Sequence, residues 1–172
     1  MSNLEILLDG MWKNYISYTP SAAKIAKLFN EELVNDHIAF RTLNLEECNI
    51  HKQAKYLSQF GYRVRGDYFF EQKKLNAIHL ENENSSLPKI FLSELMLEKF
   101  SSELSDSFKI IFTSLNVSNK DLFLGGRSWN IDYEIYKRLS KESEYASWFY
   151  VWGFCPNPVS YTHLTLPTIS RV

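Results

Sequence analysis

The segment DHIAFR carries a histidine and an arginine at a spacing that would place both side chains on one face of a β-strand. Side chains alternate along a strand, so His37, Ala39 and Arg41 would share one face. Ile38 and Phe40 would then lie on the opposite face, against a covering helix. At the rise of an extended strand, His37 and Arg41 would stand roughly 13 Å apart along the strand axis.

These two residue types together suit a metal site that binds an organic acid. An imidazole can bind a divalent transition metal, and a guanidinium can hold a carboxylate in a bidentate fork. The alternative interpretation is structural: His37 would be hydrogen-bonded within its own strand, and Arg41 would form an ion pair with Asp36 or Glu94. The spacing alone leaves both interpretations open.

Glu94 lies on a further predicted strand, KIFLSELML, which is otherwise apolar on the face that carries it. Ile90 and Leu92 would share that face, and a buried carboxylate is costly there unless it meets a metal or a cation. Glu94 could therefore be a metal ligand beside His37, a partner for Arg41, or a residue at a sheet edge.

Other candidate polar groups are less specific. His79, on the predicted strand between these two, suits either substrate contact or structural hydrogen bonding, and His51 suits a solvated or helix-capping role. Gly125-Gly126-Arg127 could hold an anion through its backbone amides, although a plain turn is the simpler interpretation. The sequence contains no GxGxxG, GxxxxGKS/T, HExxH, GxSxG or CxxC motif.

A strand, a helix and three more strands are predicted around these residues. Residues 34–43 are β-rich and free of glycine and proline. Residues 49–60 place their apolar side chains on one face, and Gly61 follows where a helix would end. Further strands are predicted over residues 62–70, 76–81 and 89–97. The predicted order is β, α, β, β, β.

Helices are predicted on both sides of this unit. Before it, apolar side chains recur at helical spacing from Leu4 to Tyr15, and Thr19-Pro20-Ser21 would begin a second helix. After it, we predict a mostly helical segment over 98–118, a loop over 124–129, and a short helix over 133–141. The aromatic run over 145–154 is predicted to be a helix that leads into a strand near residue 154.

The composition is that of a globular protein, with 45% hydrophobic, 15% aromatic and 23% charged residues. A net charge of −1, from 19 basic and 20 acidic residues, provides no broad field to attract nucleic acid or an anionic membrane. The apolar runs are far shorter than the roughly 20 residues that span a bilayer, and the N-terminus lacks a signal-peptide pattern, so we expect a cytoplasmic location. Cys48 and Cys155 are expected to be reduced thiols.

Residues 158–172 are interpreted as not native. From Val159 the sequence VSYTHLTLPTISRV departs in composition from everything before it, and VSYTHLTLPT resembles the translation of a transposase adapter used in sequencing libraries. His163 is therefore given no functional role. We expect the natural protein to continue past Asn157.

The segments VNDHIAFRTLN, KIFLSEL, GGRSW and SEYASWFYVWGFCPN together resemble the 2-oxoadipate dioxygenase/decarboxylase (hydroxyglutarate synthase) family. The resemblance extends from about Leu4 to Asn157. It implies an α+β fold similar to the vicinal oxygen chelate superfamily, in which paired βαβββ modules form a cupped sheet around one iron(II). Residues 34–97 would be the first module, with N-terminal helices over 1–33. Residues 98–157 would be a helical connection to a truncated second module.

The resemblance also implies roles for particular residues. His37 matches the first histidine ligand of Fe(2+), and Arg41 matches the arginine that holds the substrate carboxylate. The family's second histidine directly follows a stretch like GFCPN, where this chain has Pro158, and the third ligand is a glutamate of the second module. Glu94 is not the obvious match for that glutamate. The chain as written is therefore expected to bind metal weakly or not at all.

For the complete enzyme, the resemblance implies that a 2-oxo acid, 2-oxoadipate, and O2 are converted to 2-hydroxyglutarate and CO2, a step in lysine breakdown. Arg41 would orient the substrate, and His79 and Glu94 are the other candidate site residues. Two further hypotheses remain. The same sheet could bind a small carboxylic acid without converting it, or the chain could be a structural domain in which His37 and Arg41 are core polar residues.

Overall fold

The computed structural model describes residues 2–27 and 36–160 of the 172-residue chain. The helices are α1 (Asn3–Tyr18), α2 (Pro20–Ala26), α3 (Ile50–Ser58), α4 (Ser102–Thr113), α5 (Asp121–Leu124), α6 (Tyr133–Glu142) and α7 (Glu144–Trp152). The strands are β1 (His37–Leu43), β2 (Tyr62–Phe70), β3 (Leu75–Asn82), β4 (Lys89–Leu95) and β5 (Asn157–Ser160). Two 3-10 turns, η1 (Glu71–Lys73) and η2 (Leu97–Lys99), follow β2 and β4.

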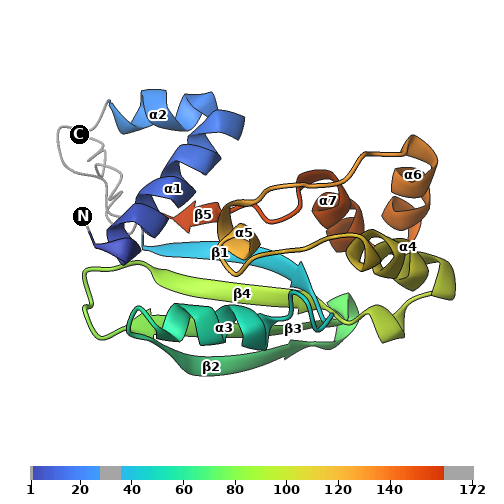
Figure 1. The fold of residues 1–172 in the computed structure, drawn as a ribbon, viewed down its shortest axis with the longest axis horizontal. Coiled ribbons are helices and arrows are strands. Elements are labelled where there is room, and N and C mark those ends of the chain that lie inside the picture. Colours follow the sequence, from blue (N-terminus) through green and yellow to red (C-terminus); the bar gives the residue numbers. More distant parts are fainter. Residues whose placement is uncertain (1, 28–35, 161–172) are drawn as a thin grey trace, which may run out of the picture.

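The strands form one mixed sheet in the order β2-β3-β4-β1-β5 (Figure 1). β1 and β4 are parallel, and the other neighbouring pairs are antiparallel. Parallel strands need a crossover, and α3 begins the connection that leads from β1 through β2 and β3 to β4. The predicted order β, α, β, β, β is therefore confirmed.

Local signals define both ends of α3. The side chain of Asn49 accepts a hydrogen bond from the backbone N–H of Lys52 at 2.9 Å, which satisfies one of the unpaired donors of the first turn. Gly61 has a φ of +87°, a conformation that glycine adopts without a Cβ penalty. The chain can therefore leave the helix and enter β2 within a few residues.

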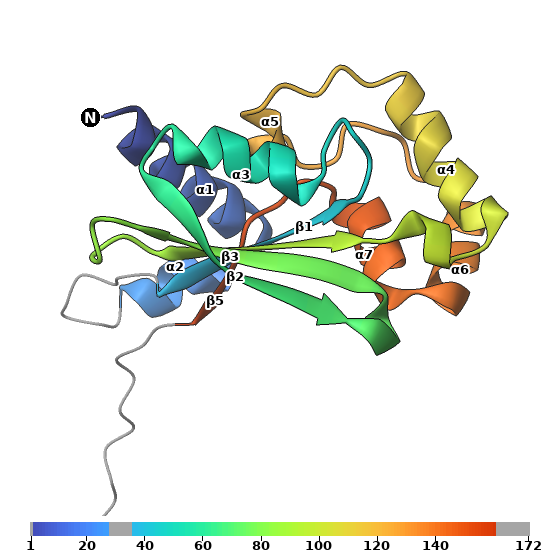
Figure 2. The ribbon, with the colours of Figure 1, turned by 90° about the horizontal axis from the view of Figure 1, so that it is seen from below.

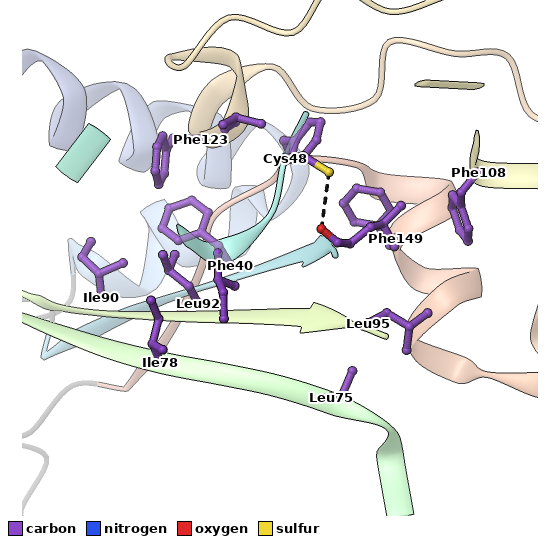
Figure 3. Close-up of a cluster of buried hydrophobic side chains, with 14 of the residues drawn as sticks. Phe40, Cys48, Leu75, Ile78, Ile90, Leu92, Leu95, Phe108, Phe123 and Phe149 are labelled. Carbon is purple, nitrogen blue, oxygen red and sulfur yellow. Dashed lines mark hydrogen bonds between the residues drawn. The ribbon is translucent and has the colours of Figure 1, made fainter. Parts of the chain in front are cut away.

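The core lies between the sheet and the helices that cover one of its faces. Figure 2 shows α1, α3 and α5 on the same side of the sheet. Ile38 and Phe40 are each 2% exposed on this face, as the strand pattern predicts. The ring of Phe40 meets Phe123 of α5 edge to face at 5.2 Å, so α5 covers β1 together with the crossover helix (Figure 3).

Some predicted boundaries are wrong. β4 ends at Leu95 rather than at residue 97, because the chain turns into η2. α4 begins at Ser102 rather than at residue 98, since Ser101 caps the Leu104 N–H at 3.1 Å. The short helix α5 was not predicted as an element.

The predictions for residues 28–35 and 161–172, including the start of the first strand and His163, lie outside the described residues. Within residues 2–27 and 36–160, no helix has the length and hydropathy needed to span a bilayer.

Candidate functional site

The sheet face opposite α3 brings the predicted site residues of β1 together. His37, Ala39 and Arg41 are all partly exposed on this face, in alternation with buried neighbours. In the parallel register, Ala39 lies beside Phe91 and Arg41 beside Ser93 of β4. His37 and Arg41 therefore lie at the two ends of a strip whose middle is apolar.

A cavity of about 860 Å³ opens onto this face. Its floor includes His37 and Arg41 of β1 and Phe91 of β4, and its walls come from the turn after β2 and from Tyr145 and Trp148 of α7. The interior is large enough for a small organic acid. The structure thus places the histidine and the arginine in one cavity, which the strand periodicity alone could not establish.

The imidazole of His37 is hydrogen-bonded to the preceding residue. Its Nδ1 lies 3.0 Å from Oδ2 of Asp36, and both side chains are 32% exposed. A carboxylate partner at Nδ1 fixes the ring orientation and favours the tautomer in which Nε2 has the lone pair, an arrangement common for metal-binding histidines. The same hydrogen bond also fits the structural interpretation of His37.

The guanidinium of Arg41 lies against aromatic rings rather than against a carboxylate. Its central carbon is 4.4 Å from the ring centroid of Trp148 and 5.2 Å from that of Tyr145. Across residues 2–27 and 36–160, Arg41 forms no ion pair, and no side-chain N–H of Arg41 donates a hydrogen bond to another described residue. The predicted alternative of an ion pair with Asp36 or Glu94 is wrong.

Glu94 does not belong to this site. It pairs in register with Thr42, not with Arg41, and so points to the helix-covered face. Its carboxylate accepts hydrogen bonds from the backbone N–H of Ile50, at 3.0 Å, and from Asn76, at 3.3 Å. All three predicted roles for Glu94 are therefore wrong, because its carboxylate caps the first turn of α3 from a central strand.

His79 shares the cavity face but stands apart from the cavity. Its Nδ1 lies 2.8 Å from the hydroxyl of Tyr68, and its Nε2 is 3.7 Å from Glu81. A Cβ at Gly66 would approach the imidazole within 2.6 Å, so this glycine makes room for the ring. The hydrogen-bonding role is observed, whereas substrate contact stays a prediction.

The remaining candidates have structural surroundings. His51 is exposed at the start of α3. The amide of Gly125 donates to Asp121 and that of Gly126 to Phe154, so this segment is a turn and does not offer those amides to an anion. Cys48 and Cys155 are buried free thiols, and burial raises the pKa of Cys48 to about 11.

β5 lies directly beside the strand that carries His37. Pro158, the position where the family resemblance places the second histidine, pairs with Ile38 in the antiparallel register. Within the described part of the chain, no group of three or more His, Cys, Asp or Glu side chains could hold a metal ion. The described residues therefore contribute at most part of a metal site.

Tyr145 and Trp148 were not predicted as site residues from the sequence. The aromatic run that contains them was predicted to be a helix, and α7 confirms this. Five of its nine residues are aromatic, so the sequence offered no signal for which of them would face Arg41.

The βαβββ order and the mixed sheet match the vicinal-oxygen-chelate-like fold that the family resemblance implied. A crystal structure from Ralstonia eutropha JMP134, named as a glyoxalase superfamily protein, has the same fold, with a TM-score of 0.59, 18% identity, and coverage of 88% of this chain and 58% of that one. The chain belongs to the 2-oxoadipate dioxygenase/decarboxylase family, whose model matches residues 7–124.

Two plant proteins named 2-oxoadipate dioxygenase/decarboxylase are similar along most of the chain. The rice protein (Oryza sativa subsp. japonica, chloroplastic/amyloplastic) is 30% identical over 94% of this chain and 48% of its own length. The Arabidopsis thaliana protein (chloroplastic) is 28% identical over 90% of this chain and 47% of its own length. The chain thus spans about half the length of these relatives.

Two further crystal structures are similar in fold and in sequence. A protein from Shewanella frigidimarina NCIMB 400 has a TM-score of 0.89 and 37% identity, covering 100% of this chain and 70% of that one. Hydroxyglutarate synthase from Oryza sativa, solved in complex with 2-oxoadipate, has a TM-score of 0.79 and 29% identity, covering 90% of this chain and 55% of that one.

Proposed function

We propose that this chain forms the N-terminal part of an iron(II)-dependent dioxygenase/decarboxylase that acts on 2-oxoadipate. The observation that carries the proposal is the guanidinium of Arg41, which lies in the same cavity as His37 without a carboxylate partner among the described residues. A charged group in that position suits an anionic ligand. The names of the plant relatives and the rice complex with 2-oxoadipate support the choice of substrate.

The apolar strip between the two polar residues supports a substrate with methylene groups. A ligand that reached from His37 to Arg41 would pass over Ala39 and Phe91, which lie side by side in the register of β1 and β4. A linear 2-oxo diacid has this pattern, with polar groups at both ends and an aliphatic chain between them. We propose that Arg41 holds the carboxylate remote from the oxo group.

His37 would supply one ligand to Fe(2+), and the other ligands would come from residues beyond those described. The bound iron would hold the 2-oxo acid and activate O2. The reaction balances without another co-substrate: 2-oxoadipate and O2 give 2-hydroxyglutarate and CO2, and O2 is the oxidant. Arg41 would fix the position of the substrate chain relative to the metal.

The adapter origin of residues 158–172, a role in lysine breakdown and a cytoplasmic location remain proposals. The names of the two plant relatives place those proteins in plastids. Genomic DNA read across the codon for Asn157 would test the first of these proposals directly.

The test of function needs a longer form of the protein, extended from the genomic reading frame to the length of its relatives. We expect iron-dependent O2 uptake with 2-oxoadipate. Arg41→Met should raise the KM for 2-oxoadipate at least tenfold, whereas Arg65→Met, which removes an exposed arginine of β2, should not change it. Tight binding of 2-oxoadipate without O2 uptake would instead support a non-catalytic carboxylate-binding module.

A further inference from the structure

Two aromatic side chains of α7 hold the guanidinium of Arg41. The central guanidinium carbon lies over the ring of Trp148 at 4.4 Å and over the ring of Tyr145 at 5.2 Å. The contact with each ring is electrostatic and does not consume an N–H donor. The planar edge of the guanidinium can therefore form a two-point hydrogen bond to a carboxylate while the rings hold the group in place.

Tyr145 is itself fixed at the junction of β1 and β4. Its hydroxyl accepts a hydrogen bond from the backbone N–H of Thr42 at 3.0 Å and donates one to the carbonyl oxygen of Ser93 at 2.6 Å. Thr42 follows Arg41 directly, and Ser93 is the register partner of Arg41. The hydroxyl of the tyrosine that contacts the guanidinium is thus hydrogen-bonded to the backbone of the residue after Arg41 and to that of the register partner of Arg41 on β4.

Burial raises the pKa of the Tyr145 hydroxyl well above its ordinary value of 10.0, so the hydroxyl is protonated and can donate at neutral pH. Trp148 follows about one turn later on the same helix, so the hydrogen bonds of Tyr145 also fix the position of Trp148.

We propose that Tyr145 and Trp148 are positioning residues that hold the guanidinium of Arg41 in one orientation in the cavity, ready to bind a carboxylate. An arginine side chain loses much conformational freedom when it binds a ligand, and a side chain that is ordered beforehand loses less. The positioning of Arg41 by Tyr145 and Trp148 does not depend on the proposed function. The identity of the carboxylate that Arg41 would bind does depend on it.

The first test measures the order of the Arg41 side chain by NMR on the chain as it is. The Nε–Hε signal of Arg41 is assigned by its absence from the spectrum of Arg41→Lys, and 15N relaxation gives its order parameter. We expect a value above about 0.8 in the parent chain, typical of rigid groups, and below about 0.6 in Trp148→Leu, typical of flexible ones. Trp148→Phe, which keeps an aromatic ring, should retain most of the order.

Trp152→Leu is the matched control, because Trp152 is on the same helix and contacts Tyr18 and Trp148 rather than Arg41. It should leave the order parameter of Arg41 unchanged. Unchanged backbone amide spectra outside α7 would show that each variant is folded. If Arg41 were as ordered in folded Trp148→Leu as in the parent chain, the proposal would be overturned.

A second test separates this inference from the proposed function. In the longer form of the protein, Trp148→Leu should raise the KM for 2-oxoadipate about tenfold and leave kcat nearly unchanged, and Trp148→Phe should restore most of the KM. If Trp148→Leu releases Arg41 in the NMR test but does not change the KM, the positioning role stands. The proposed carboxylate contact of Arg41 would then be wrong.

Discussion

At the scale of single residues, Glu94 and Arg41 have different roles because the register of β1 and β4 places them on opposite faces of the sheet. Arg41 lies beside Ser93, whereas Glu94 lies beside Thr42 and faces the core. Since side chains alternate along a strand, one step moves a residue to the opposite face of the sheet. The hydrophobic pattern predicted which residues of each strand share a face, but it contained no information on how β1 and β4 are aligned.

The buried carboxylate of Glu94 should therefore matter for stability and not for ligand binding. Glu94→Gln removes the charge that faces the first turn of α3 and disturbs the hydrogen bonds to Ile50 and Asn76. We expect the free energy of unfolding to fall by about 1–3 kcal/mol in urea denaturation. Glu83→Gln, at an exposed glutamate directly after β3, is the control and should change stability by less than about 0.5 kcal/mol. Lower iron content in the longer form of Glu94→Gln, with unchanged stability, would contradict this assignment.

At the scale of elements, Gly153 determines how α7 is joined to β5. It has a φ of +66°, directly after the last residue of α7, and the next residue, Phe154, exchanges backbone hydrogen bonds with Gly126. A Cβ at Gly153 would meet the carbonyl group of Gly126 and would approach Cα of Arg127 within 2.8 Å. Only glycine fits this close approach of two backbone segments.

Gly153→Ala should consequently destabilise the protein more than a substitution at another glycine with positive φ. Gly61→Ala is the matched comparison, because Gly61 has a φ of +87° but its nearest neighbour is a side-chain nitrogen of Asn82 at 3.3 Å. We expect a loss of about 1 kcal/mol for Gly61→Ala and on the order of 3 kcal/mol for Gly153→Ala. Thermal and urea unfolding would measure both, and equal losses would show that the backbone contact at Gly153 adds nothing.

Most of these elements could be predicted because their signals are local. Asn49 and Gly61 mark the ends of α3 in the sequence itself, and the alternation in DHIAFR predicted the buried face of β1. The contact of Arg41 with Trp148 could not be predicted, because it joins segments far apart in the sequence. Helical periodicity predicts α7, but not which of its aromatic rings will face the sheet.

At the scale of the whole molecule, the buried thiol of Cys48 links stability to pH. Burial raises its pKa from the ordinary 9.0 to about 11. Below pH 9 the thiol is protonated in both the folded and the unfolded chain, so its contribution to stability is fully present. Between pH 9 and 11 the unfolded chain loses this proton and the folded chain keeps it, so stability falls, by up to about 3 kcal/mol from this group.

Urea unfolding at pH 8, 9, 10 and 11 should therefore show a steeper loss for the parent chain than for Cys48→Ala. The variant is the necessary comparison because burial also raises the pKa of Tyr62, to about 12, and this tyrosine contributes a decline of the same sign to both proteins. Parallel curves for the two proteins would mean that Cys48 does not titrate differently in the folded and unfolded states.

At the same scale, β2 lies at the edge of the sheet formed by the described residues, and we expect copies of the chain to associate through this edge. β2 is an edge strand, and it exposes Tyr68 by 41%, Phe69 by 61% and Phe70 by 41%. Unpaired edge groups next to exposed aromatic rings favour strand pairing between molecules, so we expect the chain to self-associate as its concentration rises.

Phe69→Lys should weaken this association in sedimentation velocity, because a lysine on an edge strand opposes pairing. Ile110→Lys, at a residue of α4 that is 72% exposed, should leave it unchanged. If both variants associate as strongly as the parent chain, β2 is not the surface through which the molecules meet.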